Sequence, residues 1–259
     1  VINLDSIRAA AEGIREHVVR TPLTPAARLA ESLNCELFLK LESLQFTGSF
    51  KDRGACWKLM NLEEDQAKRG VIAMSAGNHA QGVAYHARRL GIPATIVMPE
   101  FAPFSKVVRT RAFGARVVLT GDTLDASGVA AREIAEKEGL TFVHPYDDPF
   151  IMSGQGTIGL ELLEDLPDMD CLVVPIGGGG LIGGIATAVK ALRPEVEIIG
   201  VEASLYPSMR EELSGGGSGG SGTTLADGIA VKRPGKLTAP LVKELVSDIL
   251  LVEEEAIES

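Results

Sequence analysis

The chain has 259 residues, of which 35 are acidic and 25 are basic, so its formal net charge is −10. This balance argues against nucleic acid or an anionic membrane surface as the main partner, because both are bound through clustered cations. A composition of 45% hydrophobic and 23% charged residues is typical of a globular protein with one large core or two smaller ones, and it excludes disordered and collagen-like chains.

Short β-branched runs alternate with amphipathic stretches, which predicts an α/β fold built on largely parallel sheets. The expected strands are 36–41, 71–74, 94–98, 116–119, 172–175, 197–202 and 249–252. The expected helices are 4–18, 50–62, 79–90, 105–113, 123–138, 151–163, 180–192 and 237–245. Gly91, Gly114 and Gly139 each follow an expected helix, so the run from about 71 to 146 reads as consecutive βα units and is a candidate small domain.

Two unusual stretches and the cysteines test whether the chain belongs to a membrane, disulfide-bonded or zinc-binding class of protein. Residues 171–189 carry no charge over a length that could span a bilayer, but six glycines and Pro175 break the stretch, so we reject a membrane span. Residues 214–222 contain only glycine and serine and are either a natural mobile loop or an engineered linker. The three cysteines are an odd number without C-x-x-C spacing, which favours a reducing cytoplasm over a disulfide framework or a zinc site.

The strongest chemical signal is the run of four glycines Gly177–Gly180, which lies between an expected strand and an apolar helix. Residues without side chains let backbone N–H groups converge on a ligand, and the helix N-terminus adds partial positive charge, so phosphate is the expected guest. The run has neither the lysine of a P-loop nor the G-x-G-x-x-G spacing of a dinucleotide site. The alternative is a turn whose glycines only allow close packing of helix and sheet.

A second signal is Lys51 in the segment 47–55, Thr-Gly-Ser-Phe-Lys-Asp-Arg-Gly-Ala. If Ser49 caps a helix, Lys51 lies in the first turn, where the macrodipole disfavours a cation. This placement, with Phe50 as an apolar neighbour, lowers the pKa of the amine and suits it to Schiff-base chemistry. The alternative, favoured by this segment alone, is a solvated lysine paired with Asp52 or Glu42.

The third signal is the segment 75–82, Ser-Ala-Gly-Asn-His-Ala-Gln-Gly, between an expected strand and helix. Its backbone N–H groups, with the side chains of Ser75 and Asn78, can hold a carboxylate and donate to a phenolic oxygen. We interpret His79 as a positioning or capping residue rather than the proton carrier, because the four histidines show no spacing typical of a metal site or a triad.

Together these loops supply a phosphate cradle, a reactive lysine and a carboxylate pocket. Pyridoxal 5′-phosphate uses all three when it acts on an amino acid, because it carries an aldehyde, an electron-accepting ring and a phosphate. The sequence therefore predicts this cofactor and a small amino-acid substrate.

Over essentially its whole length the chain resembles the threonine/serine dehydratases of the fold-type II pyridoxal-phosphate enzymes, which also include serine racemase. The segments that carry the resemblance, in the family's order, are 42–51, 75–79, 154–157, 177–181 and 224–228. The resemblance implies two open, twisted, mostly parallel sheets flanked by helices. It also implies a larger cofactor-binding domain from 1–68 and 147–259, a small mobile domain from 69–146 that closes on substrate, and a homo-oligomer, either a dimer or a tetramer.

The resemblance assigns roles to individual residues. Lys51 matches the lysine that is joined to the cofactor and then shuttles the α-proton, with Phe50 against the ring, and Asn78 matches the donor to the ring's 3′-oxygen. The substrate carboxylate is expected at Ser75, Ala76, Gly77, Asn78 and His79. The cofactor phosphate is expected at Gly177, Gly178, Gly179, Gly180 and Leu181, and Gly228 is expected beside the cofactor.

The implied reaction is loss of water from L-threonine or L-serine, which gives a 2-oxo acid and ammonia. Ala76 stands where the racemase carries a second serine, so dehydration is favoured over racemisation. Ser208 stands where metal-dependent members carry an aspartate that joins Glu202, so no metal site is predicted. Family members continue beyond this C-terminus to a segment that meets the pyridine nitrogen, which implies that the chain is shortened or that another chain supplies the segment.

Two other interpretations stay open. The first is a β-replacement enzyme of the same fold, similar to cysteine synthase, which adds a nucleophile where the dehydratase uses water. The second is a non-catalytic module that retains the cofactor loops without a partner for the ring nitrogen.

Overall fold

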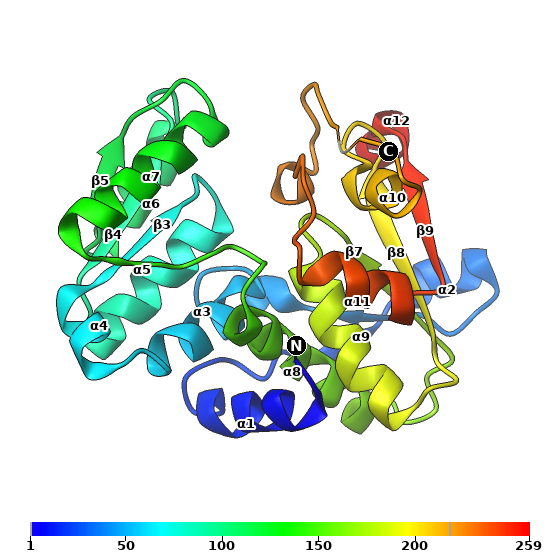
Figure 1. Ribbon diagram of the computed structural model, residues 1–259. Coiled ribbons are helices and arrows are strands. Elements are labelled where there is room, and N and C mark those ends of the chain that lie inside the picture. The colour runs from blue at the N-terminus through cyan, green and yellow to red at the C-terminus, as the bar shows by residue number, and fades with distance from the viewer. Residues whose placement is uncertain (1, 218) are drawn as a thin grey trace.

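The computed structural model describes residues 2–217 and 219–259 and has two parallel sheets in separate lobes (Figure 1). The first sheet has the order β5-β4-β3-β6 and comprises β3 Val71–Met74, β4 Ala94–Met98, β5 Arg116–Leu119 and β6 Thr141–Phe142. The second has the order β7-β8-β9 and comprises β7 Cys171–Pro175, β8 Glu197–Ala203 and β9 Asp248–Val252. A short antiparallel pair consists of β1 Leu23–Pro25 and β2 Phe38–Lys40. The predicted α/β class with mostly parallel sheets is confirmed.

The helices flank these sheets. They are α1 Leu4–Ile14, α2 Ala27–Leu33, α3 Lys51–Met60, α4 Glu64–Arg69, α5 Asn78–Leu90, α6 Phe104–Ala112, α7 Leu124–Glu138, α8 Pro149–Asp165, α9 Gly180–Leu192, α10 Ser208–Leu213, α11 Thr238–Leu245 and α12 Glu254–Glu258, with 3-10 turns η1 Glu42–Leu44 and η2 Asp227–Ile229. Gly91, Gly114 and Gly139 have positive φ angles of 69°, 87° and 67°, as expected for residues that end helices.

The hydrophobic core has two main clusters, and α3 and α8 take part in joining them. The first cluster links the four-stranded sheet and α5 to α3 and α8, the latter through Ile151. The second lies between the three-stranded sheet and the helices α8, α9 and α11. Helices α3 and α8 cross very closely, since a Cβ atom at Gly154 would lie 2.6 Å from the Cα of Gly54. Helix α3 is thereby held between the two lobes (Figure 1).

The three-stranded sheet is covered unequally. Val174, Ile198 and Ile249 on one face are buried in the second cluster. On the opposite face Val173 is 60% exposed and Leu250 is 48% exposed. One face of this parallel sheet therefore carries exposed apolar side chains.

The two unusual stretches of the sequence differ in their local structure. Residues 171–189 fold as β7, a glycine loop and α9, and no helix in the described part of the chain is long and apolar enough to cross a membrane. Residues 214–217 and 219–222 form no helix or strand, and Ser218 lies outside the described residues. The hydroxyl of Tyr206 donates to the Gly222 carbonyl at 2.7 Å, so the end of the glycine/serine run is attached to the segment before α10.

Candidate active site

Lys51 is the first residue of α3, and its side chain is partly buried. Phe50 is the N-cap and Ser49 Oγ accepts the Lys51 backbone N–H at 3.3 Å, so the helix begins one residue later than a Ser49 cap implies. Lys51 Nζ donates to the Pro145 carbonyl at 2.6 Å and lies 5.2 Å from the centre of the Phe50 ring. Burial lowers the pKa of this amine from 10.5 to about 8, which increases the neutral, nucleophilic fraction near neutral pH.

The alternative interpretation, a solvated lysine paired with Asp52 or Glu42, is wrong. Asp52 is fully buried and accepts the backbone N–H and the hydroxyl of Thr47 at 2.9 and 2.6 Å. Glu42 accepts from the Arg53 guanidinium at 2.7 Å. Both carboxylates are therefore engaged elsewhere, and the Lys51 amine is held by a neutral carbonyl.

The glycine loop Gly177–Gly180 forms the N-terminus of the 13-residue helix α9. Within residues 2–217 and 219–259, the backbone N–H groups of Gly178, Gly179 and Gly180 have no hydrogen-bond acceptor. A Cβ atom would lie 2.3 Å from the Tyr146 ring at Gly178 and 2.6 Å from Met209 Cε at Gly179, so side chains are excluded from the loop. Free N–H groups at a helix N-terminus are suited to an anion such as a phosphate.

A turn that contains Pro145 and Tyr146 connects Lys51 to this loop. Pro145 accepts the lysine amine, and the ring of the next residue, Tyr146, lies against Gly178. The Tyr146 hydroxyl donates to the Arg233 carbonyl at 2.9 Å, and burial raises the pKa of Tyr146 to about 12. The structure thus brings the predicted lysine and the predicted phosphate loop together.

The third predicted loop, Ser75–His79, joins the end of β3 to the start of α5. Ser75 Oγ accepts the Gly77 backbone N–H at 3.1 Å, Asn78 is exposed, and a Cβ atom at Gly77 would meet nothing within 4 Å. The loop therefore borders open space. It lies close to the lysine, because a Cβ atom on Gly82, one turn into α5, would approach the Lys51 carbonyl carbon to 3.3 Å.

The His79 side chain is buried and turned away from this space. Its Nε2 atom forms a hydrogen bond with the Val143 carbonyl at 3.0 Å. Burial, helped by the charge of Lys51, lowers the pKa of His79 to about 3, so the ring is neutral at physiological pH. This geometry agrees with a positioning residue and leaves the backbone N–H of His79 as the group available to a carboxylate.

The remaining predicted residues lie around the same loops. Gly228 is exposed in η2, and its neighbour Ile229 lies beside Gly177. Leu181 packs against the second core cluster and Ala76 against the first.

Glu202 has a structural environment of its own. It is fully buried and accepts the backbone N–H groups of Met209 and Arg210 at 2.8 and 3.1 Å at the start of α10. Burial raises the pKa of its carboxyl group. The part of the chain that the structure describes contains no group of three or more His, Cys, Asp or Glu side chains placed to hold a metal ion.

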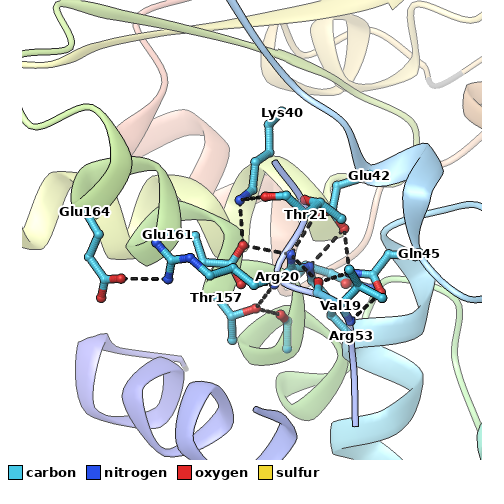
Figure 2. Close-up of polar contacts among 12 residues, drawn as sticks. Val19, Arg20, Thr21, Lys40, Glu42, Gln45, Arg53, Thr157, Glu161 and Glu164 are labelled. Atoms are coloured by element: carbon cyan, nitrogen blue, oxygen red, sulfur yellow. Dashed lines mark hydrogen bonds and ion pairs between the residues drawn. The ribbon is translucent and has the colours of Figure 1, made fainter. Parts of the chain in front are cut away.

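Sequence reasoning missed a buried ionic cluster centred on Arg53, two residues after Lys51 (Figure 2). Arg53 is fully buried and donates to Glu42 at 2.7 Å, to Glu161 at 2.6 Å and to the Thr157 hydroxyl at 3.1 Å. Lys40 also pairs with Glu161, at 2.6 Å. The cluster fastens α3 to α8, η1 and β2. No local pattern predicts it, because Glu161 is 108 residues from Arg53 in the sequence.

Comparisons with known proteins identify the family of the chain. A model of the family described as pyridoxal-phosphate dependent enzyme matches residues 14–259. The L-threonine ammonia-lyase of Thermotoga maritima is 51% identical over 259 residues, which cover 99% of this chain and 65% of that protein. The chain thus spans slightly less than two thirds of the length of this relative.

Two solved structures are similar over nearly the whole chain. Maize serine racemase has a TM-score of 0.94 and 36% identity, with 99% of this chain and 78% of that chain covered. The processed threonine deaminase isoform 2 of Solanum lycopersicum has a TM-score of 0.91 and 40% identity, with 96% and 69% covered.

The chain belongs to the family of pyridoxal-phosphate dependent enzymes. Its two parallel sheets flanked by helices are those of the fold-type II members. The residues present fit the cofactor. The Lys51 amine, whose pKa is lowered, donates to Pro145, and the neighbouring Tyr146 lies against the glycine loop, whose N–H groups have no acceptor among the described residues. Lys51 would hold the aldehyde end of pyridoxal 5′-phosphate, and Gly177–Gly180 would hold the phosphate.

Proposed function

We propose that this chain carries the catalytic site of a pyridoxal-phosphate dependent dehydratase that converts L-threonine or L-serine to a 2-oxo acid and ammonia. The observation that supports the proposal most strongly is the buried Lys51 amine beside the turn whose Tyr146 lies on the glycine loop. The similarity to an L-threonine ammonia-lyase and to a threonine deaminase supports the same reaction.

The three loops divide the tasks of the proposed reaction among them. When bound, the cofactor supplies an electron-accepting ring that acidifies the α-carbon–hydrogen bond of the amino acid. The N-terminus of α9 holds the phosphate, and the N-terminus of α5 holds the substrate carboxylate. Asn78 donates to the phenolic oxygen of the ring. Lys51 Nζ, as a neutral amine, takes the α-proton. The β-hydroxyl leaves with one proton as water, which balances the proton taken from the α-carbon. One water is then added as ammonia departs, and L-threonine gives 2-oxobutanoate.

Dehydration is favoured over racemisation by the environment of Ala76. A racemase needs an acid or base on each side of the α-carbon, because the proton must leave from one face and return to the other. Ala76 has no titratable atom, and its side chain packs against the first core cluster. We infer that Lys51 serves one face and that position 76 offers no proton to the other.

The test uses Lys51→Ala with Lys58→Ala as the control, since Lys58 lies on the same helix and pairs with Asp148 instead. Each purified variant is mixed with pyridoxal 5′-phosphate, unbound cofactor is removed, and the visible absorption of bound cofactor is measured. L-threonine is then added, and the 2-oxobutanoate formed is measured. We expect both signals from the parent and from Lys58→Ala, and neither from Lys51→Ala. Retention of both signals by Lys51→Ala would refute the proposal.

The same assay separates the other interpretations. A module that only retains the cofactor gives the absorption without 2-oxo acid. A β-replacement enzyme gives a substituted amino acid when a thiol is added. Replacing L-threonine with L-serine or other β-hydroxy amino acids then defines the preferred substrate.

We also propose that the protein is a cytoplasmic homodimer or homotetramer. All three cysteines are free thiols, which suits a reducing compartment. Leu29 and Leu33, one turn apart on α2, are 53% and 63% exposed, which suits burial against another copy. Sedimentation equilibrium measures the assembly, and a Leu33→Glu variant is expected to weaken it.

A further inference from the structure

The turn that receives the Lys51 amine is built around His144. The His144 Nδ1 atom accepts the backbone N–H of Tyr146 at 3.3 Å and that of Asp147 at 2.8 Å. A ring nitrogen that accepts cannot carry the proton, so His144 is neutral with its proton on Nε2. Burial lowers the pKa of His144 and keeps it in this form.

One peptide group lies between His144 and Lys51. The Pro145 carbonyl and the Tyr146 N–H belong to the same planar unit, so fixing the N–H also fixes the direction of the carbonyl. His144 Nδ1 holds the N–H end of this unit, and Lys51 Nζ donates to the oxygen end at 2.6 Å. Proline restricts φ to a narrow range and so limits the turn further.

The far side of the turn is attached to the segment that supports the glycine loop. The Asp147 carboxylate accepts the backbone N–H groups of Lys236 and Leu237 at 3.0 and 2.8 Å. The hydroxyl of the next residue, Thr238, donates to the Gly178 carbonyl at 2.6 Å. The direction of the Pro145 carbonyl is therefore set relative to both the lysine and the phosphate loop.

We propose that His144 is a positioning residue for Lys51: it orients the Pro145–Tyr146 peptide group so that the Pro145 carbonyl holds the lysine amine whenever that amine is not joined to the cofactor. The inference rests on the proposed role of Lys51. In that reaction the substrate displaces the lysine, and the released amine must stay beside the α-carbon to take its proton. A fixed carbonyl acceptor keeps it there.

The test compares His144→Asn with His144→Leu and His144→Gln. Asparagine places an acceptor close to the position of Nδ1 and closes the same kind of turn, whereas leucine removes the acceptor and glutamine carries it one carbon farther out. The first readout is the pH dependence of acetylation of Lys51, followed by mass spectrometry without cofactor. The second is the fraction of Lys51 trapped by borohydride after mixing with subsaturating pyridoxal 5′-phosphate. Thermal unfolding reports on folding.

In His144→Leu and His144→Gln we expect the midpoint of Lys51 acetylation to fall by about one pH unit, because the ammonium form loses its acceptor. The trapped fraction is expected to rise about tenfold, because the lost hydrogen bond stabilises only the amine that is not joined to the cofactor. His144→Asn is expected to match the parent in both.

The inference would be overturned if the midpoint of Lys51 acetylation were unchanged in the leucine and glutamine variants. It would also be overturned if the asparagine variant shifted this midpoint as much as the leucine variant does. If all three variants lost the same thermal stability and none shifted the midpoint of Lys51 acetylation, His144 would have only a structural role. If no variant, the parent included, traps the cofactor, the proposed function fails, while acetylation still tests the position of Lys51.

Discussion

Replacing Arg53 with methionine tests how strongly the buried ionic cluster stabilises the fold. Arg53 is 0% exposed, while the side chains of its partners Glu42 and Glu161 are both 14% exposed. Removing one member of a buried ion pair costs about 3–5 kcal/mol, because the other charge is left uncompensated. Glu161 keeps Lys40 at 2.6 Å, whereas Glu42 keeps neutral donors, the Thr21 hydroxyl and the Gln45 amide. We therefore expect a loss of about 3 kcal/mol, at the lower end of this range.

The assay is urea unfolding followed by circular dichroism, with Lys68→Met as the control. Lys68 is 67% exposed and pairs with an 82% exposed Glu64, so its replacement should change the free energy of unfolding by less than about 0.5 kcal/mol. A deficit below about 1 kcal/mol, or one no larger than that of Lys68→Met, would refute this reasoning.

Three further outcomes follow from the geometry. Gly154→Ala places a methyl group 2.6 Å from the backbone of α3, so it should lower the free energy of unfolding in urea by about 1–3 kcal/mol. The control Gly183→Ala, whose methyl group would lie 3.6 Å from its nearest neighbour, should lower it less. Gly178→Ala places a methyl group 2.3 Å from an aromatic ring and should weaken binding of pyridoxal 5′-phosphate at least tenfold by absorbance titration, while Gly217→Ala, which meets nothing within 4 Å, should bind like the parent. The rate at which the cofactor joins Lys51 should rise as the pH passes through about 8, since the amine is neutral above its pKa, and a midpoint near the ordinary value of 10.5 would contradict its burial.

The sequence predicts those parts of the fold and of the site that are determined by residues close together in the chain. Strands 71–74, 94–98 and 116–119 have the predicted bounds, because each contains a largely apolar run with a glycine or proline within two residues of its ends. The placement of Lys51 in the first turn of α3 follows from the segment 47–55 alone. Strands β1 and β6 were not predicted, since runs of three and two residues are too short to show alternation.

Contacts between distant segments could not be predicted in the same way. The carbonyl of Pro145 is 94 residues from Lys51, and only the tertiary fold brings the two together. The same holds for Arg53 and Glu161. A lowered pKa for Lys51 could be predicted from the helix position and Phe50, but the depth of burial that causes it depends on α5 and on the turn at 145–146.

The open face of the three-stranded sheet affects the tendency of this polypeptide to associate in solution. Parallel strands are normally sandwiched by helices on both sides, whereas here Val173 and Leu250 face water and the outer edge of β7 has no neighbouring strand among the described elements. Such a surface promotes adhesion between molecules as the concentration rises. Light scattering should therefore increase with protein concentration, and charged substitutions at these two positions should suppress the increase.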